Sequence, residues 1–423
     1  MKKSKISKAE SQALNINTQF EFPQTGGLMS LLQFGSQALL SEAIKAEITE
    51  YLGRSFYQHN LTNEKVKGYR HGVRKTTIDT PVGPVTYNRP RIHGADDFQS
   101  QFHVPYMRRP EEFAAQVCDM YVNGVSTRKI KKSLKSVTGD KVKLSKSTVS
   151  RITKSLVLEF NEWKKRDLSE LKVSYLFFDA IRVGMRIGGD SKDAIMIAYA
   201  ILEDGSFTVL SIDISNSESN KSWGRFSTGL KQRGLKDPIL CISDGNQGVI
   251  NAINSNFPTS LRQRCVKHKV ENILDTVPKE NQKDLRKKLN TIFYGATSLE
   301  QAKLFIKEFK KTYSKKFPTA VAILEADLDQ CLTFYIFPRN HWLKIRTSNK
   351  LERLNLEIRR RLNVIGRHPS EEGCLALIYQ VSKNYSFPQQ RAQVNDLVRK
   401  LWEKIKLERT EMIAQLELDL YAA

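Results

Sequence analysis

The stretch Val173-Ser-Tyr-Leu-Phe-Phe-Asp179-Ala-Ile-Arg-Val183 is nearly continuous β-prone sequence. Two turns follow it, at Gly188-Gly-Asp190 and at Glu203-Asp-Gly205, and each is followed by another β-prone segment. Strands joined by such short turns predict an antiparallel meander. Beyond the meander, a helical pattern, a strand at 239–243 and a second helical pattern succeed one another. This order predicts an α/β fold with a mixed sheet flanked by helices.

Three strands followed by alternating helix and strand is the element order of an RNase H-like core. We expect the first part of this core at 170–276. Apolar residues at helical spacing then predict an all-helical insertion at 277–340. The second part of the core is expected at 341–385, and a helical tail at 386–423.

The N-terminal third has a different character. We expect a flexible arm at 1–35, then a helix and a basic β-hairpin within 36–110, because β-prone residues flank a Pro/Gly turn. Three short helical patterns within 111–160 predict a helix-turn-helix DNA-binding domain. A solvated basic loop is the alternative for the hairpin, and a packing module without a DNA role is the alternative for the three helices. The residues expected to contact DNA here are Arg128, Lys146, Ser147, Thr148 and Arg151.

The charge of the chain indicates a polyanionic partner. Lys and Arg number 68 against 45 Asp and Glu, which gives a net charge of +23 over 423 residues. The longest apolar runs are about half the length that spans a bilayer, so no membrane is expected as a partner. No signal-peptide pattern follows the basic N-terminus. Five scattered cysteines fit a reducing cytosol.

Three carboxylates, Asp179, Asp244 and Glu352, stand where acids are otherwise poor choices. Asp179 shares a strand face with apolar residues, and a buried carboxylate without partners is costly. Asp244 ends the apolar run 238–243, and Glu352 lies beside the apolar stripe of an arginine-rich helix. The alternatives are a buried salt bridge for Asp179, a turn or helix cap for Asp244, and an exposed ion pair for Glu352.

Carboxylates from different elements that converge on a pair of cations are what metal-dependent phosphoryl transfer requires. We therefore predict that Asp179, Asp244 and Glu352 are catalytic and hold two Mg²⁺ or Mn²⁺ ions. Polar and cationic residues near Glu352 would position DNA: Arg346, Asn349, Arg353, Arg359 and Arg360. No phosphate-binding loop for ATP and no serine-hydrolase elbow is present in the sequence.

Cys265 and His268 have half of a zinc-site spacing, but the other cysteines stand alone. A structural zinc is one interpretation of the pair. The other places it at a strand-to-helix junction beside Asp244, where His268 hydrogen-bonds the site or a phosphate.

Several ordered blocks resemble the bacterial Mutator-type insertion-sequence transposases. They include Gly124-Val-Ser-Thr-Arg-Lys-Ile130, Cys241-Ile-Ser-Asp-Gly245, Gln263-Arg-Cys-Val-Lys-His-Lys-Val-Glu-Asn272 and Arg346-Thr-Ser-Asn-Lys-Leu-Glu-Arg-Leu-Asn355. The resemblance runs from about residue 42 to about residue 385. Departures from the family pattern, such as Ser348 where a second Thr is common, touch none of the carboxylates.

This resemblance implies a DDE-type transposase with an RNase H-like core and a helical insertion between the second Asp and the Glu. Asp179, Asp244 and Glu352 would take the catalytic positions. Cys265 and His268 would form the family's Cys-x-x-His signature, and Trp223 its tryptophan. The expected partners are double-stranded DNA, as terminal inverted repeats and target, and a second copy of the chain in a homodimer.

We expect Mg²⁺-dependent DNA cleavage and strand transfer in the bacterial cytoplasm, associated with the nucleoid. Two alternatives stay open from the sequence. One is a DNA-binding regulator with an inert nuclease-like core, and the other is a nuclease or resolvase that cuts without joining.

Overall fold

The computed structural model describes residues 27–56, 58, 68–103, 109–138, 142, 144–187, 190–347, 349–365, 367–368, 370–385 and 392–422. They belong to two compact units that divide between Thr153 and Lys154. Of the predicted arm, residues 1–26 lie outside the described part, and helix α2 already begins at Leu28. No helix among the described residues is long and apolar enough to cross a membrane.

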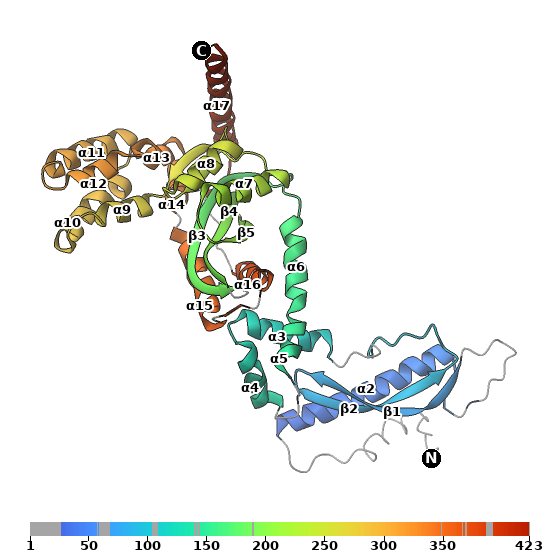
Figure 1. The fold of residues 1–423 in the computed structure, drawn as a ribbon. Helices are drawn as coiled ribbons and strands as arrows, with labels where there is room; N and C mark the ends of the chain where they lie inside the picture. The colour runs from blue at the N-terminus through green and yellow to red at the C-terminus, as the bar shows by residue number, and fades with distance from the viewer. Residues whose placement is uncertain are drawn as a thin grey trace, which may run out of the picture. The chain divides into compact units, whose positions relative to one another are not determined.

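In the first unit, helix α2 (Leu28–Leu52) packs against the hairpin of β1 (Tyr69–Thr80) and β2 (Gly83–His93). Ile44 and Ile48 of α2 share a small core with Ile78, Val85 and Tyr87 of the hairpin. The hairpin and the preceding helix are present as predicted (Figure 1). The helix covers the buried face of β2, where Val85 and Tyr87 alternate with exposed residues, and Ile78 of β1.

Three further helices complete this unit, α3 (Glu111–Val122), α4 (Thr127–Thr138) and α5 (Lys146–Ile152). The Ser145 hydroxyl caps α5 by accepting a hydrogen bond of 3.1 Å from the backbone N–H of Thr148. The predicted succession of three helices is confirmed. The third of them is short and ends at Ile152, since the chain turns at Thr153 and α6 (Lys154–Lys165) begins in the second unit.

The second unit is built on a mixed sheet in the order β5-β4-β3-β6-β7. Its strands are β3 (Val173–Ile187), β4 (Asp190–Leu202), β5 (Phe207–Ser215), β6 (Leu240–Ser243) and β7 (Leu261–Arg264). The meander of β3, β4 and β5 is antiparallel as predicted, while β6 and β7 run parallel to β3. The sequence did not single out β7, which is four residues long.

One face of the sheet carries the main core. Helices α7 (Asn220–Gln232) and α8 (Gln247–Asn256) pack there, with Trp223 and Phe226 against Phe178 of β3. Side chains alternate along a strand, so Phe177 and Asp179 point to the opposite face. That second face is where helix α15 (Asn349–Ile365) meets β3 and β4.

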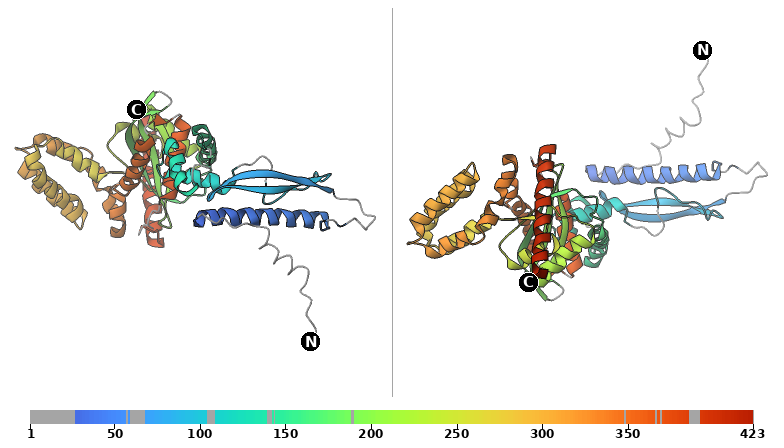
Figure 2. Two further views of the ribbon diagram at one scale, coloured as in Figure 1. Left: turned by 90° about the horizontal axis from the view of Figure 1, so that it is seen from below. Right: turned by 90° about the horizontal axis from the view of Figure 1, so that it is seen from above.

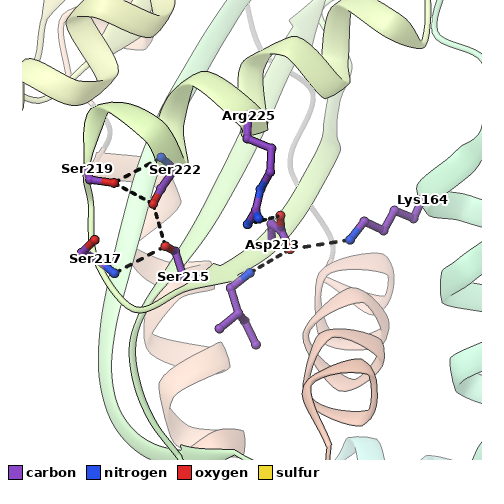
Figure 3. A network of polar contacts seen from close by, with 8 residues as sticks. Lys164, Asp213, Ser215, Ser217, Ser219, Ser222 and Arg225 are labelled. Atoms are coloured by element: carbon purple, nitrogen blue, oxygen red, sulfur yellow. Dashed lines mark hydrogen bonds and ion pairs between the residues drawn. The ribbon is translucent and has the colours of Figure 1, made fainter.

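Hydroxyl groups fix the connection from β5 into α7. Ser219 caps α7 by accepting from the Ser222 backbone N–H at 3.2 Å, and the Ser222 hydroxyl lies 2.8 Å from that of Ser215 (Figure 3). On the same strand, the Asp213 carboxylate is 3.6 Å from Lys164 and 3.8 Å from Arg225. These contacts hold α6 and α7 to the edge strand of the sheet.

Between β7 and α15 the described chain is helical. The segments are α9 (Val266–Leu274), α10 (Lys279–Asn290), η3 (Thr291–Gly295), α11 (Leu299–Tyr313), α12 (Pro318–Glu325), α13 (Leu328–Leu332), η4 (Thr333–Ile336) and α14 (Arg339–Ile345). Figure 2 shows α10, α11 and α12 as one helical lobe of this unit. Buried Gln263 joins the insertion to β7, since its side chain bonds the backbone carbonyl of Cys331 and the N–H of Phe334.

The chain returns to the sheet through β8 (Arg367–His368), which pairs parallel to the far end of β3. Helix α16 (Glu371–Asn384) then packs against α6, and α17 (Asp396–Ala422) ends the chain. The helices predicted for the insertion, for residue 352 and for the tail are thus all present.

Candidate active site

Asp179 lies in the middle of β3, on the sheet face that α15 approaches. Its Oδ1 accepts from the backbone N–H of Ala180 at 3.0 Å, and its Oδ2 accepts from Asn355 Nδ2 at 2.8 Å. Burial raises the pKa of Asp179 to about 6, although His268 and the two hydrogen bonds act in the opposite direction. Its two hydrogen-bond donors are neutral, and His268 is the charged neighbour that favours its ionised form.

Asp244 follows directly on β6, and the strand register explains why it is close to Asp179. Phe177 of β3 pairs with Ile242 of β6 in parallel, so the residues two positions further along each strand are Asp179 and Asp244. Neighbouring strands lie about 4.8 Å apart. Consistent with this, the Asp244 charge contributes to the raised pKa of Asp179.

A tight turn fixes the Asp244 carboxylate. Its Oδ1 accepts from the backbone N–H of Asn246 at 3.0 Å, and Asn246 in turn caps α8 through Gly248. Gly245 is required there because a Cβ at that position would lie 1.7 Å from Nη1 of Arg264. The Arg264 guanidinium is buried and forms a 2.9 Å ion pair with Asp327 of the insertion.

Glu352 lies in the first turn of α15. One helical turn further on, Asn355 bonds Asp179 and accepts from the buried Tyr199 hydroxyl at 2.8 Å. The helix of Glu352 is thereby tied to the two central strands. The Glu352 carboxylate forms an ion pair with Lys267 of α9.

Cys265 and His268 sit at the junction of β7 and α9, as one interpretation predicts. A hydrogen bond with Cys265, followed by the charges of Asp179 and Asp244, raises the pKa of His268 to about 9 in spite of burial. His268 is therefore a cationic neighbour of both aspartates. In the described part of the chain, no group of three or more His, Cys, Asp and Glu side chains is placed to hold a metal ion. This holds for Cys265 and His268, and it holds equally for the predicted set of Asp179, Asp244 and Glu352, which the structure does not gather into one metal-binding group.

The other predicted residues are spread over both units. Trp223 is 2% exposed and packs edge-on against Phe178, so it supports β3 from the face opposite Asp179. Arg353, Arg359 and Arg360 are exposed on α15. In the first unit Arg128, Ser147 and Arg151 are exposed and Thr148 is partly buried. The side chains of Lys146 and Asn349 lie outside the described residues.

Arg346 is placed differently from the other predicted DNA-contacting residues. It is 7% exposed, and its guanidinium donates to the Phe293 carbonyl at 3.2 Å. In this structure the guanidinium of Arg346 therefore contacts the protein itself. Contact of DNA with Arg346 stays a prediction.

Sequence reasoning did not single out Asn355, Tyr199, Lys267 or Arg264 as members of the site. Asn355 carried one usable signal, since it stands three residues after Glu352 and hence on the same side of the helix. Tyr199 carried none, because a tyrosine in a β-strand is typical of any sheet.

The donors present fit a divalent cation at the two aspartates. Asp179 and Asp244 are hard oxygen ligands, each two positions beyond a register pair of neighbouring strands, and Asp179 is buried, which raises its pKa because burial disfavours the ionised form. The third predicted ligand, Glu352, is held by Lys267, so it would have to exchange this partner to join them.

Comparison with known proteins identifies the family of the chain. The model of the family "Transposase, Mutator family" matches residues 8–390. The transposase for insertion sequence element ISRM5 of Rhizobium meliloti is 33% identical over 81% of this chain and 84% of its own length. The transposase for element IS256 in transposon Tn4001 of Staphylococcus aureus is 31% identical over 80% of this chain and 86% of its own.

Among solved structures, the Drosophila P element transposase strand transfer complex aligns with a TM-score of 0.31 and 12% identity, over 69% of this chain and 84% of that one. The classification rests on the sequence matches, which place the molecule among the transposases. The chain belongs to the Mutator family, alongside transposases of bacterial insertion sequences.

Proposed function

We propose that this chain moves an insertion sequence by binding its terminal inverted repeats, cleaving DNA and joining the freed 3′-hydroxyl to a target phosphate. The observation that supports this most strongly is the register of β3 and β6, which sets Asp179 in the middle of β3 next to Asp244 at the end of β6. The helix of Glu352 lies against the same face through Asn355.

The sheet order and the long helical insertion support an RNase H-like core of the DDE type. Asp179 and Asp244 would hold Mg²⁺ or Mn²⁺, and Glu352 would complete the set after leaving Lys267. Bound metal would supply an activated water and stabilise the charge on the leaving oxygen. His268 would keep a positive charge beside the aspartates, and Lys267, once free of Glu352, is placed for a DNA phosphate.

The basic surfaces support the DNA-binding part of the proposal. Arg353, Arg359 and Arg360 are exposed on α15. The helices of the first unit carry exposed Arg128 and Arg151, in keeping with a helix-turn-helix role in binding the repeats. Since an element has two ends, each needing an active site, the working form would be a homodimer.

A second candidate is a DNA-binding regulator with an inert core. The ion pair of Glu352 with Lys267 is the observation that favours it, because a carboxylate neutralised by lysine contributes less to a metal site.

Incubation of the protein with duplexes of the element's ends and Mg²⁺ separates the two candidate functions. Nicking and joining by the wild type, both absent in Asp244→Asn, support the transposase. Binding without nicking by the wild type supports the regulator, and nicking without joining supports a nuclease.

A further inference from the structure

The segment η3 between α10 and α11 is a π-helix of five residues, Thr291–Gly295. Such turns are rare, cost regular hydrogen bonding and are frequent at functional sites. Here the wider turn buries Ile292 and Phe293 and leaves the neighbouring Tyr294 with 41% of its surface exposed. The backbone irregularity therefore has one clear effect, which is to present an aromatic ring to solvent.

Arg346 fixes the orientation of this ring. The guanidinium carbon lies 4.3 Å from the centroid of the Tyr294 ring, and Nη1 of the same group donates to the Phe293 carbonyl. Arg346 is itself buried, and its backbone carbonyl accepts from the N–H of Val266 at 2.9 Å. A planar cation held in this way covers one face of the ring and leaves the position of the ring little freedom.

The ring also lies beside the proposed active site. Val266, which anchors Arg346, stands between Cys265 and Lys267, the partner of Glu352. Burial raises the pKa of the Tyr294 hydroxyl, and the charges of Cys265 and Glu352 add to this effect while Arg346 opposes it. Glu352 is thus within electrostatic reach of the Tyr294 hydroxyl.

The alternative interpretation is that Tyr294 only covers the hydrophobic core of the insertion and binds no ligand. That interpretation does not explain why a buried arginine is stacked on the ring, where an aliphatic side chain would fill the space without desolvating a charge. Tyr294 keeps 41% of its surface exposed while Arg346 stacks on its ring. Exposed aromatic rings and arginine side chains are the groups on which nucleic-acid-binding proteins stack bases.

We propose that Tyr294, backed by Arg346, is a stacking site for an unpaired nucleobase of the DNA next to the scissile phosphate. The inference rests on the proposed function, because it takes DNA as the substrate. An aromatic surface beside the active site would stabilise a base that has left the stack, and base-on-aromatic stacking tolerates any base. Tyr294 would then position the substrate and would not take part in the chemistry.

The test uses the full chain in an Asp244→Asn background, which keeps the DNA intact. The probe is a duplex of the element's end with 2-aminopurine at the nucleotide next to the cleavage point. Stacking on Tyr294 quenches the probe, so we expect its fluorescence to rise in Tyr294→Leu and to stay quenched in Tyr294→Phe and Tyr294→Trp. Affinity for the duplex should fall about tenfold in Tyr294→Leu, in line with the loss of one stacked base.

Leu304→Ala, at a 62% exposed position of α11 in the same helical insertion, is the matched control and should match the parent. An unchanged quench and affinity in Tyr294→Leu, with an unchanged melting temperature, would overturn the inference. Failure of the proposed function has a different result. In that case the protein with an intact Asp244 does not nick the duplex, while the fluorescence response of 2-aminopurine to the Tyr294 substitutions is unchanged.

Discussion

Nδ2 of Asn355 lies 2.8 Å from Oδ2 of Asp179, and this hydrogen bond joins two residues that are 176 positions apart in the chain. Because the oxygen of the same amide accepts from Tyr199, the orientation of the amide is fixed at both ends. The bond aligns the helix that carries Glu352 with the strand that carries Asp179, across the whole insertion. Asn355 is in this sense the positioning residue of the site.

Replacement of Asn355 by Ala should weaken metal binding and cleavage by about 10- to 100-fold, the usual effect of removing a partner that orients a metal ligand. Tyr199→Phe should have a smaller effect of the same direction, since the amide loses one bond and keeps the other. Titration of Mn²⁺ binding by electron paramagnetic resonance measures this without DNA. An affinity equal to that of the wild type in Asn355→Ala would refute the positioning role.

Lys267 competes with a metal ion for Glu352. Both side chains are about one third exposed, so the ion pair itself is worth at most about 1 kcal/mol. We expect Lys267→Met to bind Mn²⁺ roughly fivefold more tightly in the absence of DNA, and to bind DNA less well because a cation is lost. The control uses the Glu352→Gln variant as the parent. Adding Lys267→Met to this parent should leave its affinity for Mn²⁺ unchanged. Weaker Mn²⁺ binding by Lys267→Met alone would contradict the competition.

Gly245 makes room for the Arg264 guanidinium, which is planar, buried and held by Asp327. Gly245→Ala should therefore cost about 1–3 kcal/mol of unfolding free energy, as overpacking of a rigid site does. Gly229→Ala in α7 meets nothing within 4 Å and should stabilise the helix by up to about 1 kcal/mol. Urea unfolding measures the free energy of unfolding of both variants. Equal values for the two would contradict the steric role of Gly245 and show that the turn adapts to a side chain.

His368 on β8 is fully buried, and burial lowers its pKa to about 4. The unfolded chain takes up its proton near pH 6.5, before the folded chain does. The contribution of neutral His368 is therefore complete above pH 6.5 and is lost as the pH falls towards 4, up to about 3 kcal/mol. Between pH 7.5 and 4.5, urea unfolding should show a steeper loss for the wild type than for His368→Met, and parallel curves would contradict the depressed pKa.

How far the sequence predicts this molecule depends on the range of the interactions. The hairpin, the meander and the helices follow from local periodicity, and the structure has them where the sequence places them. The register of β3 with β6 and the contact of Asn355 with Asp179 are pairings between distant segments, which no local pattern contains. Arg346 shows the same limit, because its charge suggests a DNA contact, whereas the fold turns it onto Phe293 and Tyr294.

The same distinction between local patterns and long-range contacts applies to the charged residues of the site. The oddly placed aspartates were visible in the sequence because apolar neighbours surround them on the strands. The ion-pair partner of Glu352 was not visible in the sequence, because Lys267 is 85 positions away and lies close to Glu352 only in the folded chain. The seven-segment division of the chain, including the boundaries of the insertion, stays a prediction beside the two compact units of the structure.

The central claim is that Asp179, Asp244 and Glu352 form one metal-dependent active site that cleaves and joins DNA. Its most direct measurement follows end-labelled duplexes of the element's terminus with Mg²⁺, for the wild type and for Asp179→Asn, Asp244→Asn and Glu352→Gln. The account predicts nicked and strand-transfer products with the wild type alone, while all four proteins bind the duplex. Nicking and joining that persist in any of the three variants, or a wild type that binds and never nicks, would contradict it.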